Sequence, residues 1–219
     1  MKKISIILIS LILLLVIFNK ILFSYLITFT VSKLFERETF IEKIELNYSK
    51  QEIVLNFIEI RNIDTFYYKN IFEADKIKIY YNFKSLFSDL VIIDYVLFEN
   101  IKFFLEFKTI NGSNKILDDN IEVVKKLDSN YKPKIYPTKK KDKNFLILKT
   151  ELKNSKTFIK TSNNTNVITI NMSDMIFYKV GNRTTYQHYK NLFKTILQDL
   201  FYKVPNKNLR NLLKKTYKF

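Results

Sequence analysis

Apolar and polar residues alternate along most of the stretch from Phe40 to Phe107, which is the pattern of half-buried β-strands. The stretch divides into short runs, and each run places its apolar side chains on one face of a strand. The apolar positions, in chain order, are Ile44, Leu46, Tyr48, Ile53, Leu55, Phe57, Ile58, Ile60, Phe72, Ala74, Ile77, Ile79, Tyr81, Ile101, Phe103, Leu105 and Phe107. The sequence therefore predicts a ladder of antiparallel strands at the centre of the fold.

The alternation slips by one residue at two places, after Phe57 and between Ala74 and Ile77. Such a slip moves the following side chains to the opposite face of the sheet unless a bulge or a bend absorbs it. We therefore expect a strongly curved sheet with a continuous apolar inner face. The candidate inner-face residues are Ile44, Leu46, Ile53, Leu55, Ile58, Ile60, Ile77, Ile79 and Tyr81.

The beginning of the chain is apolar enough to enter a membrane. Residues 4–18 and 21–31 are mostly apolar, and Asn19 and Lys20 separate them. A span needs ~20 residues, so the two parts together are long enough, and no small-residue cleavage site follows them. The two lysines before residue 4 favour a cytoplasmic N-terminus with the bulk of the chain outside.

After Phe107 the alternation of apolar and polar residues is replaced by other patterns. Leu117, Ile121 and Val124 recur at helical spacing and predict a short amphipathic helix. Residues 129–143 hold two prolines and a lysine run without apolar periodicity, which predicts a linker; a patch for anionic lipid or nucleic acid is the alternative. Further strands are expected at residues 145–152, 157–160, 167–172 and 175–180.

The last part of the chain has a period of 3.6 residues. Tyr189 to Val204 carries one wide apolar stripe, which predicts a long helix packed on the sheet and ended by Pro205. Asn206 or Asn208 begins a final helix. It either lies on an anionic membrane surface or docks on the domain, and its basic positions are Lys207, Arg210, Lys214 and Lys215.

Together these patterns predict an α+β protein in which an N-terminal transmembrane helix precedes a curved, mainly antiparallel sheet of about seven to nine strands. A long amphipathic helix covers that sheet. The expected divisions are an anchor and collar at 1–35, the β-ladder with a short helix at 36–128, the linker at 129–143, and strands with two amphipathic helices at 144–219. The last division packs with the ladder as one domain.

Charge and composition exclude several classes of function. The formal net charge is +16, but only four of the 37 basic residues are arginine, and the lysines are spread along the whole chain as on a solvated surface. The chain has no cysteine and two glycines, so a thiolate nucleophile and a glycine-rich phosphate loop are excluded. The single His188 lacks acidic partners nearby in sequence, and neighbouring Asp118 and Asp119 point apart on a helix. We expect no catalytic residue, cofactor or metal site, and no enzyme.

The spacing of apolar residues resembles that of the AsmA-like envelope proteins over nearly the whole chain. The resemblance is carried by Ile44-x-Leu46, Ile53-x-Leu55-x-x-Ile58-x-Ile60, Phe72-x-Ala74-x-x-Ile77-x-Ile79-x-Tyr81, Ser85-Leu86-Phe87 and Leu90-x-Ile92-Ile93. It continues downstream at Asn114, Phe145-Leu146-Ile147, Ile168-x-Ile170-x-x-Ser173-Asp174-Met175, Gly181 and Thr185. The chain departs from the family where a Pro-x-Gly turn is usual and reads Asp64-Thr65-Phe66-Tyr67.

This resemblance implies a single-pass inner-membrane protein of Gram-negative bacteria whose bulk faces the periplasm. Larger AsmA-like proteins carry an elongated, curved sheet with an apolar groove and are linked to phospholipid movement and envelope integrity. The expected function is therefore a lipid-binding or lipid-transfer-related module of envelope biogenesis. Its partners would be the membrane, phospholipid and other envelope proteins, and nucleic acid is the least favoured partner.

A non-enzymatic scaffold that binds another protein through a sheet edge is the alternative. The two functions differ in one structural feature, because a helix whose Leu192, Ile196 and Leu200 cover the sheet completely leaves no room for lipid.

Overall fold

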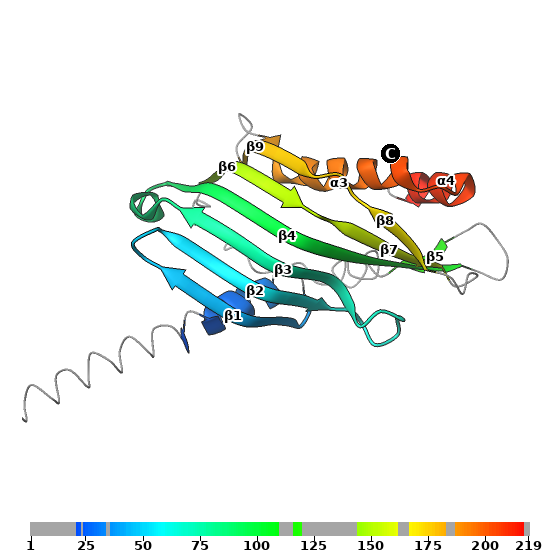
Figure 1. Ribbon diagram of the computed structural model, residues 1–219, viewed down its shortest axis with the longest axis horizontal. Coiled ribbons are helices and arrows are strands. Elements are labelled where there is room, and N and C mark those ends of the chain that lie inside the picture. The colour runs from blue at the N-terminus through cyan, green and yellow to red at the C-terminus, as the bar shows by residue number, and fades with distance from the viewer. Residues whose placement is uncertain are drawn as a thin grey trace, which may run out of the picture.

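A computed structural model describes residues 21–22, 24–33, 36–109, 116–119, 144–161, 167–182 and 187–216. Residues 24–33 are helical, and ten strands of these ranges form one sheet (Figure 1). The elements are β1 (Thr39–Asn47), β2 (Glu52–Arg61), β3 (Asn70–Tyr81), the 3-10 helix η1 (Phe83–Phe87), β4 (Leu90–Thr109), β5 (Ile116–Asp119), β6 (Asn144–Lys153), β7 (Lys156–Thr161), β8 (Ile168–Asn171), β9 (Met175–Gly181), β10 (Gln187–His188), α3 (Tyr189–Lys203) and α4 (Lys207–Thr216).

The sheet is mixed. β1 to β4 pair as an antiparallel meander, and β4 then pairs in parallel with β6 along its first half and with β7 along its second half. β9 and β8 pair antiparallel with β6 and β7, respectively, and β10 adds a short parallel pair to β9. β6 and β7 thus act as one long strand interrupted at Asn154 and Ser155, beside the twenty-residue β4.

A crease crosses this sheet. Inner-face positions change phase at the same level in adjacent strands, between Leu55 and Ile58 in β2 and between Ala74 and Ile77 in β3. Three residues near this level have positive φ angles: Phe57 at 50°, Asn100 at 54° and Asn154 at 52°. Both slips predicted from the sequence lie on this crease, and because each strand changes phase where its neighbour does, the inner face stays apolar through it.

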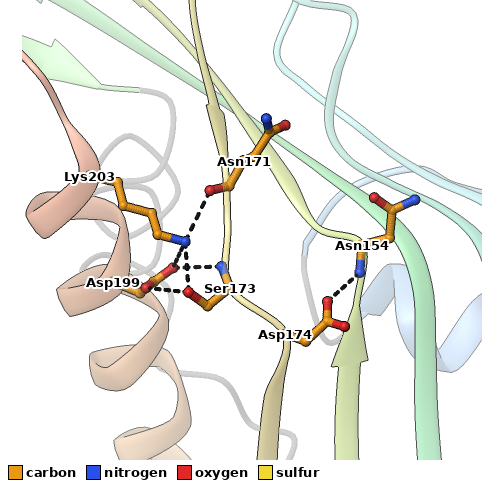
Figure 2. A network of polar contacts seen from close by, with 6 residues as sticks. All are labelled: Asn154, Asn171, Ser173, Asp174, Asp199 and Lys203. Atoms are coloured by element: carbon orange, nitrogen blue, oxygen red, sulfur yellow. Dashed lines mark hydrogen bonds and ion pairs between the residues drawn. The ribbon is translucent and has the colours of Figure 1, made fainter.

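Polar side chains bridge the strands along the crease. Asn100 Nδ2 in β4 donates to Asp75 Oδ2 in β3 at 2.9 Å, and Asn154 Nδ2 donates to Asn100 Oδ1. The backbone N–H of Asn154 donates to Asp174 Oδ1 at 2.8 Å, at the interruption between β8 and β9 (Figure 2). This chain of hydrogen bonds fixes the level of the crease from β3 to β9.

The two halves of the sheet have different cores. β4, β7 and β8 pack against α3 and α4 around Phe107, Phe201 and Leu213, all of which are almost fully buried. β1 to β4 form a second cluster around Leu55 and Ile77, and many of its members are only partly buried. The helices α3 and α4 therefore bury the half of the sheet formed by β4, β7 and β8 more completely than the half formed by β1 to β4.

The expected α+β fold class is wrong. Within the described ranges no helix is both long and apolar enough to cross a membrane, although residues 1–20 of the expected anchor lie outside those ranges. The sheet is mixed, because β4 pairs in parallel with β6 and β7, and β10 pairs in parallel with β9. In the part of the chain that the structure describes, no long amphipathic helix covers the sheet; α3 has fifteen residues and α4 has ten.

Several local predictions also need correction. Residues 116–119 form strand β5 against the end of β4, where the sequence predicted a helix, so Asp118 and Asp119 are strand residues. In the expected collar, residues 32–33 are helical, and residues 36–37 form a turn and a bend. His188 belongs to β10 rather than to the first turn of α3. The predicted linker at 129–143 and residues 120–128 lie outside the described residues.

Candidate functional site

The half of the inner face formed by β1 to β4 is the part of the described molecule that most resembles a binding surface. Leu55, Ile58, Ala74, Ile77 and Val96 form its buried base. Partly buried apolar side chains surround this base: Ile27, Ile41, Ile44, Ile53, Phe72, Ile79, Ile93, Phe98 and Ile147. The surface is apolar throughout, and its rim remains in partial contact with solvent.

Six of the nine predicted inner-face residues lie together in this cluster. Ile44, Ile53, Leu55, Ile58, Ile77 and Ile79 belong to the cluster, and Ile60 is buried farther along β2. Leu46 is partly buried outside the cluster. Tyr81 differs, because a register shift between Tyr80 and Tyr81 separates it from the phase of Ile77 and Ile79.

The helix α3 covers the other half. Leu192 and Ile196 pack on the cluster that contains Ile101, Leu152, Phe177 and Val180, and Leu200 is buried in the cluster around Phe107. Neither α3 nor α4 contributes to the β1–β4 cluster; Ile27 of the helical residues 24–33 is its one described member from outside the sheet. The condition that would exclude lipid, complete coverage of the sheet by α3, is therefore not met in the described residues.

A polar cluster formed by Asp199, Lys203 and Ser173 attaches α3 to the connection between β8 and β9 (Figure 2). Asp199 accepts hydrogen bonds from the Ser173 backbone N–H at 2.9 Å and from Ser173 Oγ at 3.1 Å. Lys203 Nζ lies 3.3 Å from Asp199 Oδ2, donates to Ser173 Oγ at 2.7 Å and donates to the Asn171 carbonyl at 3.1 Å. An ammonium that is ion-paired and donates two hydrogen bonds cannot accept a proton from Ser173, so this cluster positions the helix and is no nucleophile–base pair.

The outer face of the same strands is charged. Ion pairs join Lys43 to Glu45 and Lys78 to Glu99, and a third joins Lys102 to Glu73 across β3 and β4. Paired charges and lysines over strands favour solvent contact. An apolar ligand therefore has only the inner face available on these strands.

The most perturbed carboxylate lies on this outer face. Glu151 accepts from Tyr95 OH at 2.7 Å and forms ion pairs with Lys149 and Lys153, the latter at 3.0 Å. Hydrogen bonds from Lys149, Tyr95 and Lys153 lower the pKa of Glu151 to about 2. Burial and the bond to Glu151 raise the pKa of Tyr95. The carboxylate is held ionised, which suits a strand cross-link and leaves it unfit as a proton acceptor near neutral pH.

Tyr81 lines an open pocket of about 460 Å³ at the end of β2, β3 and β4. The other lining residues are Lys50, Gln51, Tyr80, Asp94 and Tyr95. Tyr80 and Tyr95 stack with ring centroids 5.9 Å apart, and the bond to Glu52 is the main cause that raises the pKa of Tyr80. None of the residues that line this pocket belongs to the apolar cluster.

The basic helix α4 uses its apolar side within the protein. Leu209 and Leu213 are buried in the cluster around Phe107, and Asn206 Oδ1 caps the helix by accepting from the N–H groups of Asn208 and Leu209. Arg210 donates to the Val204 carbonyl at 2.6 Å. Lys207 and Lys214 are exposed; the side chain of Lys215 lies outside the described part of the structure. Any membrane contact of α4 would thus involve its charges rather than these leucines.

Sequence analysis missed both polar clusters. Asp199 and Lys203 are four residues apart on a helix, a spacing that predicts an ion pair, but nothing local indicates Ser173 as their partner. Glu151 meets Tyr95 only because β6 lies parallel to β4. In the described ranges no group of three or more His, Asp or Glu side chains could hold a metal ion.

Comparisons of this chain with protein-family models, with curated proteins and with solved structures found no match. The function must therefore be argued from the geometry of the chain itself.

Proposed function

We propose that this chain is an AsmA-like, membrane-associated protein whose β1–β4 inner face binds the acyl part of a lipid. The observation that carries the proposal is the contrast between the two faces of these strands. The inner face of β1–β4 holds seven partly buried apolar side chains around a buried base, and the outer face carries paired charges. Partly exposed apolar surface gains free energy when a ligand covers it, at about 25 cal/mol per Å².

The apolar N-terminal sequence supports a location beside a bilayer. Residues 4–18 carry almost only isoleucine, leucine, valine and phenylalanine, with lysines before them. This composition favours a cytoplasmic N-terminus with the bulk of the chain outside. The resemblance to AsmA-like proteins implies that the membrane is the inner (plasma) membrane and that the bulk lies in the periplasm. A lipid leaving that membrane would have a short path to the inner face, and a role in lipid transfer for envelope biogenesis follows.

A scaffold that binds another protein through a sheet edge is the second candidate. β1 is the terminal strand in the order of the sheet, so one side of its backbone has no strand partner in the described residues. Such an edge can take an added strand. The charges at Glu42, Lys43 and Glu45 oppose uncontrolled pairing, which is how natural edges avoid aggregation.

Two adjacent residues of β2 allow a matched test. Ile53 points to the inner cluster, and Val54 is its neighbour on the outer face, where it pairs with Glu45 and Lys78. The full chain is purified in mild detergent as wild type, Ile53→Gln and Val54→Gln. Retained lipid is then quantified by mass spectrometry, and circular dichroism checks the fold.

We expect about one retained lipid per wild-type chain, a several-fold loss in Ile53→Gln and no loss in Val54→Gln. Lipid held by the N-terminal segment is the same in all three proteins and cancels in the comparison. Absence of stoichiometric lipid on the wild type, or equal loss in both variants, contradicts lipid binding by the inner face and favours the scaffold.

A further inference from the structure

The connection between β3 and β4 presents apolar side chains to solvent. Within η1 the exposed fractions are 50% for Phe83, 36% for Leu86 and 79% for Phe87. The rings of Phe83 and Phe87 contact each other edge to face, with centroids 5.5 Å apart. Three exposed large apolar residues within five positions form a patch that a solvated loop does not need.

The backbone of this loop is held firmly. Ser85 is buried, and its Oγ donates to the Asn82 carbonyl at 2.7 Å and accepts from the Ile92 N–H at 2.8 Å. Asn82 Oδ1 caps the turn by accepting from the Ser85 N–H. Because Ser85 fixes the turn from inside, the side chains on either side of it are directed outward by the fold.

The turn between β1 and β2 extends the patch. Gln51 Oε1 accepts from the Phe83 N–H at 2.7 Å, and the Gln51 carbonyl accepts from the Tyr81 N–H at 2.9 Å, so turn and loop are joined. Tyr48, next to this turn, is 61% exposed, and Lys50 in the turn and Lys84 in η1 are also exposed. Mixed aromatic rings and lysines are the composition of protein surfaces at the bilayer–water interface.

The position of the patch in the fold indicates its partner. In Figure 1 the η1 loop and the β1–β2 turn lie at the left end of the sheet, and the first described helical residues, 21–22, lie toward the same end. The apolar residues 4–18 of the sequence come directly before that point. A bilayer that holds those residues would therefore face this end of the sheet.

We propose that Phe83, Leu86 and Phe87, together with Tyr48, dock this end of the sheet on the surface of a phospholipid bilayer. The rings enter the headgroup region, and Lys50 and Lys84 contact lipid phosphates. The docking does not require lipid on the inner face, so it goes beyond the proposed function and can hold if that function fails.

The absence of cysteine from the sequence makes a site-specific test direct. Leu86→Cys and, as control, Asp64→Cys each give one reactive thiol for an environment-sensitive fluorophore. Asp64 is exposed in the connection between β2 and β3, at the opposite end of strands ~40 Å long. The labelled full chain is reconstituted into phosphatidylcholine vesicles, with and without phosphatidylglycerol, that carry spin-labelled lipid as quencher.

We expect blue-shifted emission and several-fold stronger lipid quenching at position 86 than at position 64. Adding Phe83→Ser and Phe87→Ser to the Leu86→Cys chain should abolish most of that quenching while circular dichroism stays unchanged. Quenching that grows with phosphatidylglycerol supports the lysine contacts as well. Water-like emission at position 86, or equal quenching at 86 and 64, overturns the proposal. A blue shift without lipid quenching also overturns it, since it would show that a second copy covers the patch.

Discussion

The backbone of Phe57, at the crease in the sheet, leads to a prediction about stability. Its φ of 50° lies in the left-handed region, and its side chain is 55% exposed. Residues with a Cβ pay about 1–2 kcal/mol there, whereas glycine does not. The neighbouring Asn56 has no positive φ, so glycine gains nothing at that position.

The perturbation is a pair of substitutions at each position, to alanine and to glycine. Glycine in a strand costs about 0.5–1 kcal/mol relative to alanine through its freedom in the unfolded chain. At Phe57 the relief of the left-handed backbone exceeds this cost, so Phe57→Gly should be about 0.5–1 kcal/mol more stable than Phe57→Ala. At Asn56 the order should reverse by about the same amount. Both variants at a position lose the same side-chain contacts, which cancel.

The assay is urea denaturation of the full chain in mild detergent, followed by far-ultraviolet circular dichroism. In thermal unfolding the same difference corresponds to about 2–4 °C per kcal/mol for a chain of this size. An alanine-to-glycine change with the same sign and size at positions 56 and 57 would refute the assignment of a left-handed backbone to Phe57.

Three further predictions use the same assay. Phe107→Ala should cost about 3–5 kcal/mol because Phe107 is fully buried, whereas Phe87→Ala should lie within about 0.5 kcal/mol of the wild type; similar losses would contradict the assigned core. The pKa of Glu151 is lowered from 4.5 to about 2 in the folded state, so its contribution is complete above pH 4.5 and is lost as the pH falls towards 2. The stability difference between wild type and Glu151→Gln should shrink over that window, and a pH-independent difference would exclude the ion-paired carboxylate as its cause. Asp199→Ala should lower the free energy of unfolding by about 1 kcal/mol and make α3 easier to cleave by protease. Unchanged cleavage would show that the hydrogen bonds between Asp199 and Ser173 are not needed to hold α3.

Sequence alone located the strands well because each strand carries its own period of two. The runs predicted at 145–152, 157–160 and 175–180 match β6, β7 and β9 to within one residue at each end. The slip at Phe57 was visible for the same reason, since one residue with a positive φ changes the phase of the local pattern while the pairing register stays constant. The cap at Asn206 was also predictable, because capping depends on residues two and three positions further along.

The errors concern contacts between distant residues. The apolar spacing from Leu117 suited a helix, but residues 116–119 extend the sheet because the end of β4 offers unpaired backbone groups. Parallel pairing of β4 with β6 joins residues more than fifty positions apart, such as Leu90 and Asn144, which no local pattern encodes. The apolar stripe of α3 predicted packing on a sheet face but could not say which half of the face it covers.

The geometry of the inner face also limits what the proposed function can be. The β1–β4 region is four strands wide, which at ~4.7 Å between strands is ~15–20 Å. One leaflet of a bilayer core is ~15 Å thick, so the region matches a single acyl chain lying across the strands. The face does not continue as an open surface past β4, because α3 and α4 pack on its other half around Phe107. A conduit between two membranes needs an apolar path far longer than this. The arrangement therefore favours a module that holds one lipid beside the bilayer, and further transport would require a partner whose own apolar surface joins the open half.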